Sequence, residues 1–513
     1  MNLDLANRDL LTRSDCIACG RCVKSCGQGA RTWDLLWREN YAEPETVAKD
    51  DSACLDSPSS HGSNGSNGSN GSNGSNGSHG SKTSACYIPF RGKLARFFLP
   101  LLCKSPSAMA RFAREQTPFY GEYYKGFDLD DFESLPILPK SRVREADPFD
   151  FLAKAYREKV SLYGETTGSS GSPTPSFLTE AEFSAAARLS QITPYAGRMA
   201  TQFKRNRVCV NGLAFGFTIA GQSFGDMLAK SGGLVANLGS RSTLATPERI
   251  AGAIARLKPA IITGTPIDFL SWMRILKEDH PESYGDVLDN LDVFLSSAEL
   301  CSDSRSKAIE RHFGIHHVDN YATVEGFFTM ACPCGSKHVL PLYHTELFNP
   351  RLKKIGHYGR GRLVFSNLAK RSSPLLRYLL DDLVTIRPSR CPWGFKKEIV
   401  PHGRYEMSVS LKEELLNVED FEEEIFREGL FGDYRVLFLD GDSVKIEIED
   451  YAAPEGAASA LGSRIERRFS LKPEIVLLPF GSLTEYRRVR EVKPILKLRD
   501  ERSNSRQEIP KVL

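Results

Sequence analysis

Hydrophobic positions change spacing along the middle of the chain, and the change predicts strands interleaved with helices. Apolar residues first repeat at intervals of three and four, the spacing of an amphipathic helix: Ile250, Ala253, Ile254 and Leu257. Thr246 suits the N-cap of that helix and Pro247 its first turn. The apolar run 260–263 follows as a short buried strand. This alternation favours a layered α/β domain.

The pattern changes after residue 404. The apolar runs 436–439 and 444–448 flank Asp440-Gly441-Asp442, which predicts a β-hairpin. A helix comes next, with Leu461, Ile465 and Phe469 on one face, and a strand at 475–478 closes the unit. A hairpin, a helix and a strand predict a small α+β domain.

A repeat of Ser, Asn and Gly occupies residues 59–84. This composition cannot bury a core, so the segment is predicted to be a flexible tether. We therefore expect four parts: a Cys-rich unit at 1–58, the linker at 59–84, a large domain at 85–403 and a mobile small domain at 404–513.

Charge and composition narrow the class of protein. The 513 residues carry 67 Lys and Arg against 64 Asp and Glu, which gives no electrostatic footprint for nucleic acid or for an anionic membrane. No apolar run is long enough to span a bilayer, and the N-terminus lacks the basic and apolar regions of a signal peptide. We expect a cytoplasmic protein of unknown oligomeric state.

One segment rich in glycine and hydroxyl groups follows a predicted strand at 160–163. Backbone N–H groups in such a turn form a concavity for anions, and the hydroxyls add donors. The predicted phosphate-binding residues are Thr166, Thr167, Gly168, Ser169, Ser170, Gly171 and Thr174. A flexible Gly/Ser linker is the alternative, and a Walker loop is excluded because no Gly-Lys-Ser/Thr follows.

Five segments between residues 115 and 500 together resemble the adenylate-forming ligases, specifically the phenylacetate–coenzyme A ligase branch. In chain order they are Thr166–Thr174, Ser296–Leu300, Asn320–Glu325, Pro374–Leu383 and His402–Met407. The first is similar to the family's phosphate loop, the third to its Tyr-Gly-x-Ser/Thr-Glu motif and the last to its hinge. Each motif alone is weak, but their order is specific.

The resemblance implies a large layered α/β domain with a small α+β domain, and a reaction in two steps. A small aryl or acyl acid attacks the α-phosphate of ATP, and the thiol of coenzyme A or of a carrier protein's phosphopantetheine then displaces AMP. Glu325 would hold Mg²⁺ and Asp382 the ribose hydroxyls, while Tyr321 would lie against the adenine. Arg404 would contact the nucleotide from the hinge, and Glu299 falls among the nucleotide-binding residues.

The chain departs from the family pattern at several of these positions. Ser172 replaces the loop lysine, which removes a positive charge near the phosphates. Val324 replaces the hydroxyl residue that would contact the α-phosphate, unless Thr323 substitutes for it. Leu380 replaces a threonine and Glu406 the hinge aspartate. These changes indicate an unusual substrate, a slower enzyme or partial loss of activity.

The family's C-terminal catalytic lysine has no clear counterpart, because the Gly-Lys pair is absent. Lys493 is the first choice and Lys497 the second, and both could instead be solvated surface charges. The acyl pocket is expected near 211–217 and Thr265-Pro266, where phenylalanines beside glycines could form an aryl slot or ordinary core.

Two cysteine clusters suggest metals. Cys16, Cys19, Cys22 and Cys26 have the spacing of a bacterial ferredoxin and predict a [4Fe–4S] cluster, with zinc or redox-reactive thiols as alternatives. Cys54 or Cys86 could complete that ligand set.

The second cluster combines a close Cys-x-Cys pair with a histidine and a distant cysteine. Cys332, Cys334, His338 and Cys391 could form a structural Zn²⁺ site, the alternative being buried inert thiols.

Three functions are compatible with these patterns. The leading one is an acid–thiol ligase. A second is an enzyme that transfers AMP to a redox cofactor such as a deazaflavin. An iron–sulfur module formed by the N-terminal cysteines would suit a redox-linked partner of that kind. A third is a degenerate ligase fold that serves as a scaffold.

Overall fold

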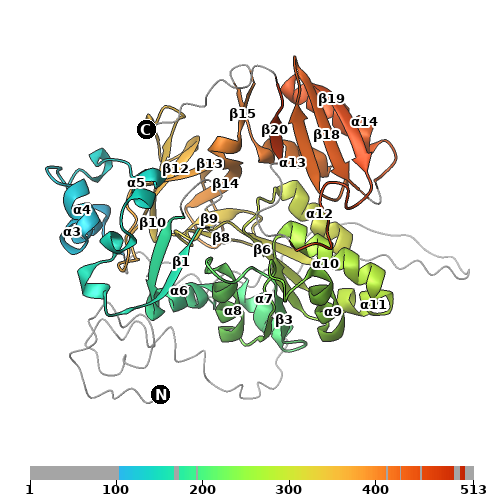
Figure 1. Ribbon diagram of the computed structural model, residues 1–513, viewed down its shortest axis with the longest axis horizontal. Coiled ribbons are helices and arrows are strands. Elements are labelled where there is room, and N and C mark those ends of the chain that lie inside the picture. Colours follow the sequence, from blue (N-terminus) through green and yellow to red (C-terminus); the bar gives the residue numbers. More distant parts are fainter. Residues whose placement is uncertain are drawn as a thin grey trace, which may run out of the picture. The chain divides into compact units, whose positions relative to one another are not determined.

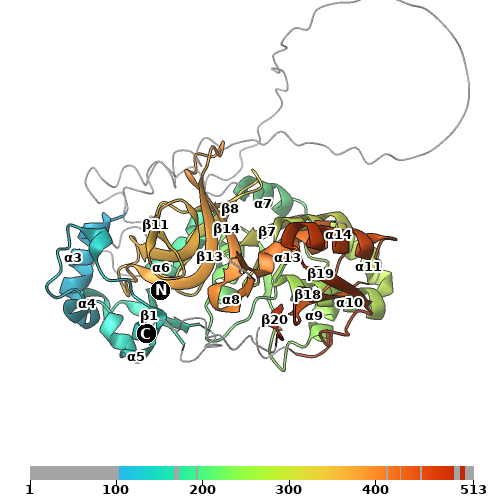
Figure 2. The same cartoon turned by 90° about the horizontal axis from the view of Figure 1, so that it is seen from above.

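The computed structural model describes residues 103–166, 173–191, 195–411, 414–427, 429–450, 453–489 and 497–502. The predicted N-terminal cysteine unit and the Ser-Asn-Gly tether lie outside these ranges, so both stay predictions. The described helices and strands are drawn in Figures 1 and 2.

A parallel sheet of five strands lies at the centre of the α/β part, in the order β4-β3-β5-β6-β7. Its strands are β3 (Val208–Asn211), β4 (Leu234–Asn237), β5 (Ile261–Gly264), β6 (Val293–Ser297) and β7 (His316–Asn320). Alternate side chains of each strand enter different cores, because successive residues of a strand face opposite sides. Val210, Ile262 and Phe294 pack with one set of helices, whereas Cys209, Ile261 and Val293 pack in another core.

Helices cover both faces of this sheet, as parallel sheets require. Those whose buried residues share the first core are α9 (Pro247–Leu257), α10 (Pro266–Asp279), α11 (Pro281–Asn290) and α12 (Asp303–Phe313). Those in the other core are α7 (Ala196–Phe203) and α8 (Ala220–Lys230). The predicted start of α9 is confirmed: the Thr246 hydroxyl accepts a hydrogen bond from Arg249 N at 3.3 Å, and Pro247 is the first helical residue.

A second sheet has seven antiparallel strands in the order β11-β10-β12-β13-β14-β9-β8. The strands are β8 (Thr329–Ala331), β9 (Lys337–Val339), β10 (Tyr343–Phe348), β11 (Lys354–Gly356), β12 (Gly359–Asn367), β13 (Tyr378–Pro388) and β14 (Lys397–Arg404). Its core includes residues of α3 (Pro106–Gln116), α4 (Pro118–Tyr123) and α5 (Lys140–Glu145).

The C-terminal part is built on a four-stranded sheet in the order β19-β18-β17-β20. The predicted hairpin is confirmed as β17 (Tyr434–Phe438) paired antiparallel with β18 (Ser443–Glu449). The strands β19 (Lys472–Leu478) and β20 (Leu498–Asp500) join in parallel on either side. Helix α14 (Ala457–Phe469) buries Leu461, Ile465 and Phe469, as its sequence pattern predicts, and lies beside β18 and β19 in Figure 1.

The remaining elements connect these parts. They are the antiparallel pairs β1 (Val160–Glu165) with β2 (Pro175–Thr179) and β15 (Val409–Leu411) with β16 (Glu414–Leu416), helices α6 (Glu180–Gln191) and α13 (Val418–Arg427), and four short 3₁₀ turns. The predicted fold class, a layered α/β domain with a small α+β unit, is confirmed. Within the described ranges no helix combines the length and the apolar character needed to cross a membrane.

Strand pairing brings the predicted motifs together. Ser297 at the end of β6 pairs with Asn320 at the end of β7, so the segments that follow both strands begin at one edge of the parallel sheet. In the other sheet, Asp382 of β13 pairs directly with Arg404 of β14. The ligand sites of open α/β sheets lie at the carboxyl ends of the parallel strands, which here is the edge where β6 and β7 end.

Candidate active site

Asp382, Tyr321 and Arg404 meet although they come from three separate motifs. The Tyr321 hydroxyl donates to Asp382 Oδ2 at 2.6 Å, and Arg404 Nε lies 3.7 Å from Asp382 Oδ1. Burial, and the neighbouring Asp382 carboxylate, raise the pKa of Tyr321 well above its ordinary value, so the phenol stays a donor. A carboxylate can accept about four hydrogen bonds. Asp382 therefore keeps acceptor capacity for a pair of hydroxyls.

Glu325 is buried and is tied to the phosphate-loop stem through a tyrosine. The Tyr378 hydroxyl donates to Glu325 Oε1 at 2.9 Å and lies 3.4 Å from the Thr174 hydroxyl. The other oxygen of Glu325 accepts no hydrogen bond from a described residue, which leaves it available to a hard cation. Tyr378 lies in the fourth motif, but sequence reasoning gave it no role.

Thr166 and Thr174 form the neck of the glycine-rich segment. Thr166 N donates to Thr174 O at 3.1 Å, and Thr174 N donates to the Thr166 hydroxyl at 2.9 Å. The neck continues the antiparallel pair β1–β2, in which Glu165 is opposite Pro175. The rest of the predicted loop, from Thr167 to Ser172, lies outside the described residues, so its contact with phosphate stays a prediction.

The hydroxyl of Thr323 is a buried donor with no hydrogen-bond partner in the described part of the chain. Thr323 and Gly326 exchange two backbone hydrogen bonds, of 3.2 and 3.1 Å, which hold Val324 and Glu325 in a tight turn. Buried polar groups are rarely left unsatisfied. A buried hydroxyl thus lies one residue before Val324, on the same turn as Glu325, and its contact with the α-phosphate stays a prediction.

Lys370 is a buried lysine beside the strand β2, and the sequence analysis did not predict it. Its ammonium is buried and donates to the Ser176 hydroxyl at 2.7 Å. Burial lowers the pKa of Lys370 to about 8, against the opposing pull of the Glu182 and Glu325 carboxylates. Asn367 Oδ1 fixes the local turn by accepting from Lys370 N at 2.8 Å. The only sequence signal is the basic pair Lys370-Arg371 just before the fourth motif.

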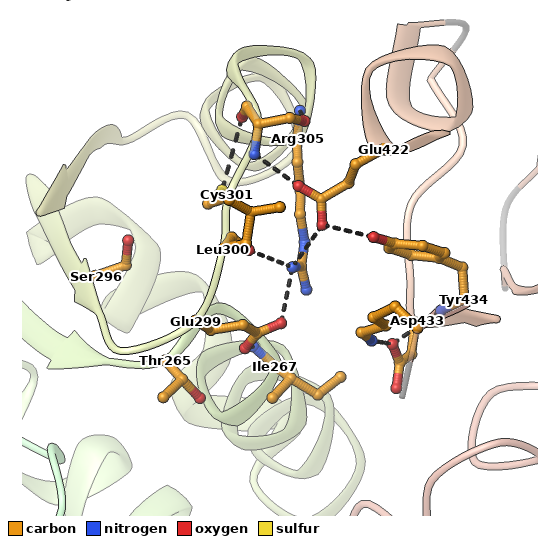
Figure 3. A network of polar contacts seen from close by, with 12 residues as sticks. Thr265, Ile267, Ser296, Glu299, Leu300, Cys301, Arg305, Glu422, Asp433 and Tyr434 are labelled. Carbon is orange, nitrogen blue, oxygen red and sulfur yellow. Dashed lines mark hydrogen bonds and ion pairs between the residues drawn. The ribbon is translucent and has the colours of Figure 1, made fainter. Parts of the chain in front are cut away.

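Glu299 takes part in a separate network of polar contacts, which Figure 3 shows. One of its oxygens accepts from Ile267 N at 3.1 Å, near the start of α10, and the other pairs with Arg305 Nη1 at 2.8 Å. Arg305 also pairs with Glu422 of α13 at 3.1 Å, and Tyr434 donates to the same Glu422 oxygen at 3.1 Å. Both Glu299 oxygens have protein partners here, so its predicted contact with the nucleotide stays a prediction.

Of the two candidate catalytic lysines, only Lys497 lies among the described residues. Its ammonium pairs with the buried Asp433 carboxylate and lies 4.8 Å from the centre of the Tyr434 ring. Lys497 O accepts from Val436 N at 2.8 Å, which joins the residue to the C-terminal sheet. Lys497 is thus engaged within the small unit, and Lys493, the first choice, stays a prediction.

The predicted acyl-pocket segment divides into a buried and an exposed part. Asn211 is buried and donates to Gly221 O at 2.7 Å and to Asn237 Oδ1 at 2.8 Å. Phe215 and Phe217, by contrast, are 40% and 72% exposed. These two rings are not ordinary core, so the aryl-slot interpretation stays open.

The second predicted metal cluster is assembled. Ligand atoms of Cys332, Cys334, His338 and Cys391 all lie within 4.8 Å of one another, with Cys332 and Cys391 sulfurs 3.6 Å apart and Cys334 Sγ 3.2 Å from His338 Nε2. His338 Nδ1 lies 3.2 Å from the Lys397 carbonyl, which favours the proton on that nitrogen, and the lone pair of Nε2 then faces Cys334. The donor set and its convergence fit a tetrahedral Zn²⁺ site. Cys16, Cys19, Cys22 and Cys26 lie outside the described residues.

Another group of possible metal ligands consists of Glu133, His344 and His357. A positively charged side chain lies beside this group. Lys354 already pairs with the Glu133 carboxylate and, at 3.2 Å, with Glu346. A divalent cation would face that ammonium, so we assign no metal to this group.

Comparison with known proteins supports the resemblance. No protein-family model matches the chain. It is 27% identical over 301 residues to a phenylacetate–coenzyme A ligase of Aromatoleum evansii, covering 54% of this chain and 64% of the relative. It is 25% identical over 369 residues to the phenylacetate–coenzyme A ligase of Escherichia coli K12, covering 66% and 79%. The chain thus spans slightly less than two thirds of the Aromatoleum relative.

Solved structures agree on the fold. A 2-hydroxyisobutyryl-CoA ligase, in its postadenylation state with 2-HIB-AMP, superposes with a TM-score of 0.63 at 17% identity, over 80% of this chain and 90% of the other. An open conformation of that ligase with 2-HIB-AMP and CoA gives 0.52, over 80% and 92%. Together with the similarity to the phenylacetate–coenzyme A ligases, these superpositions show that the chain has the fold of the adenylate-forming ligases.

Proposed function

We propose that this protein is an ATP-dependent acid–thiol ligase, which activates a small carboxylic acid, aryl or acyl, as its adenylate. The observation that carries the proposal is the convergence of Asp382, Tyr321 and Arg404 from three motifs on one carboxylate with acceptor capacity to spare. The similarity to phenylacetate–coenzyme A ligases supports an aryl acid and coenzyme A as substrates.

Each residue then has a role in the first step. Asp382 accepts hydrogen bonds from the ribose hydroxyls, Tyr321 lies against the adenine and Arg404 contacts the nucleotide. Glu325 would hold Mg²⁺ through Oε2, which accepts no hydrogen bond from the described residues, and the Thr323 hydroxyl would donate to the α-phosphate. The acid's carboxylate oxygen attacks the α-phosphorus, and the bond to the oxygen that bridges to the β-phosphate breaks. Pyrophosphate leaves with that electron pair, held by the segment between Thr166 and Thr174.

The second step transfers the acyl group. A thiol of coenzyme A, or of a carrier protein, attacks the adenylate carbonyl, AMP leaves and the thiol proton is released. We assign the charge-stabilising lysine of the first step to Lys493, and the hinge between the two conformations to the segment around Glu406.

The test is pyrophosphate exchange. Wild-type protein with ATP, Mg²⁺ and labelled pyrophosphate should incorporate label into ATP only when a suitable acid is added, from a panel of aryl and short acyl acids that includes phenylacetate. Exchange without thiol, followed by thioester on addition of coenzyme A, would support both steps. A protein that binds ATP but exchanges with no acid would support the scaffold reading instead. AMP transfer to an added deazaflavin would replace the thiol as acceptor.

We further propose that Cys332, Cys334, His338 and Cys391 bind a structural Zn²⁺ that pins the strand β9 to the segment after β13. Metal analysis should find about one zinc per chain, which Cys391→Ser removes. A variant with Cys16, Cys19, Cys22 and Cys26 replaced by Ser should keep this zinc and lose any iron and brown colour. Zinc content unchanged by Cys391→Ser would overturn the assignment.

A further inference from the structure

Lys370 carries a buried positive charge for which the described residues offer no ion pair. Only 7% of the residue is exposed, and the Ser176 hydroxyl, at 2.7 Å, is the one partner of its ammonium in the described part of the chain. An ammonium has three donors. A buried charge is costly unless an opposite charge compensates it. The position is therefore explained best by an anion that binds from outside the protein.

Two carboxylates, those of Glu182 and Glu325, oppose the effect of burial on the pKa of Lys370. Neither of these described residues forms an ion pair with its ammonium. Glu182 Oε1 accepts from Arg371 N at 2.9 Å and Ser372 N at 3.0 Å, and its Oε2 accepts from Thr179 N at 2.9 Å. Glu182 thus holds the backbone of the turn that presents Lys370. Glu325 is held by Tyr378 and has the proposed role at Mg²⁺.

The geometry places Lys370 beside the stem of the phosphate loop. Thr174 and Ser176 are two residues apart on an extended segment, so their side chains share one face. Thr174 lies next to Tyr378, which donates to Glu325, and Ser176 accepts from Lys370. Lys370 and Glu325 are consequently linked to the same face of the same segment, immediately after the loop neck.

We propose that Lys370 binds the β- and γ-phosphates of ATP and then the pyrophosphate that leaves, supplying the positive charge that Ser172 cannot. The inference rests on the proposed function and adds to it a residue that acts on the leaving group. A compact ammonium on a flexible stem suits this role, because it can leave Ser176 and follow the phosphate oxygens. AMP lacks both of these phosphates and gains nothing from Lys370.

Binding of ATP and AMP to the full-length protein, measured by calorimetry, tests the inference without knowledge of the acid. Lys370→Gln should weaken ATP binding roughly 10- to 150-fold, the range expected for a lost charge-assisted hydrogen bond. The same variant should bind AMP within about twofold of wild type, whereas Lys370→Arg, which keeps the charge but not the compact ammonium, should keep part of the ATP affinity. Lys204→Gln, at an exposed lysine, is the matched control and should change neither affinity.

Two further readouts separate a role at the phosphates from a structural one. Lys370→Gln should slow pyrophosphate exchange but spare thioester formation from a supplied acyl adenylate, a step without pyrophosphate. Adding Ser172→Lys to Lys370→Gln should restore part of the ATP affinity, because the charge returns from the loop. Equal loss of ATP and AMP binding, or no loss of either, would overturn the inference alone. Wild-type protein that binds neither nucleotide would overturn the proposed function and this inference with it.

Discussion

Two lysines with little exposed surface, the buried Lys370 and the partly buried Lys497, lie in different parts of the molecule and have different surroundings. Lys497 pairs with the buried Asp433 carboxylate inside the small C-terminal unit. Lys370, beside the phosphate-loop stem, donates to a neutral hydroxyl and has no ion pair among the described residues. Removing one partner of a buried pair is costly because the other charge is left uncompensated, whereas a buried charge without an opposite charge already costs stability and is retained for something else. The difference indicates which lysine is structural and which is available to a ligand.

The same contrast extends to neighbouring groups. On the turn that carries Glu325, the Thr323 hydroxyl has no hydrogen-bond partner among the described residues, and Glu325 Oε2 accepts no hydrogen bond from them. Near Lys497, Asp433 also accepts from the Thr484 hydroxyl at 2.8 Å, and Tyr434 donates to Glu422. Among the described residues of these two groups, the spare hydrogen-bonding capacity lies on Thr323, Glu325 and Lys370.

The largest effect is expected on the phosphate side, from Glu325→Gln. Loss of the carboxylate removes the Mg²⁺ ligand, and the rate of adenylate formation should fall about 10²- to 10³-fold, as for other groups that stabilise transition-state charge. Pyrophosphate exchange measures it, and circular dichroism checks the fold. Exchange within a few fold of wild type would remove Glu325 from the site.

On the small-unit side, Lys497→Met should destabilise the fold, because Asp433 would be left buried and unpaired. Breaking a buried pair typically costs about 3–5 kcal/mol. Chemical denaturation should show the loss, with Lys472→Met, at an exposed lysine of β19, as the neutral control. Normal stability with slow adenylate formation would instead make Lys497 the catalytic lysine.

Lys370→Met should have the opposite effect on stability. Burial lowers the pKa of Lys370 from 10.5 to about 8, so the unfolded chain binds more protons than the folded one between these values. Wild-type stability should therefore rise from pH 8 to 10.5, and at pH 7 the methionine variant should be more stable by up to about 3 kcal/mol. A variant less stable than wild type at pH 7 would indicate that Lys370 is structural, like Lys497.

The smallest effect is expected from Thr323→Val, which removes one hydroxyl from the turn that carries Glu325. A hydrogen bond to a charged group such as the α-phosphate contributes about 1.5–3 kcal/mol, so adenylate formation should slow roughly 10- to 150-fold. Stability should be unchanged or slightly higher, because a buried donor without a partner is lost. Single-turnover formation of the adenylate is the measurement. An unaltered rate would mean that Thr323 does not replace the hydroxyl missing at Val324.

The sequence predicted the elements that local chemistry determines. The Thr246 cap of α9 and the hairpin around Asp440-Gly441-Asp442 depend on neighbours within a few residues. Motif order likewise predicted Tyr321 and Asp382 as members of one site, and the structure brings them together.

Lys370 could not be predicted in this way. Its ammonium donates to Ser176, which is 194 residues away in the sequence, and a single lysine in a loop carries no periodic signal. For the same reason, the sequence did not predict the ion pairs of Lys497 with Asp433 and of Glu299 with Arg305, which join residues from separate segments.

A crystal structure of the protein with AMP and pyrophosphate would test the central claim most directly, that one site joins Asp382, Glu325 and Lys370 around a nucleotide. We expect the ribose hydroxyls on Asp382 and the Lys370 ammonium about 3 Å from a pyrophosphate oxygen. Lys497 should remain on Asp433. A nucleotide bound away from Asp382, or pyrophosphate that leaves Lys370 on Ser176 alone, would contradict the account.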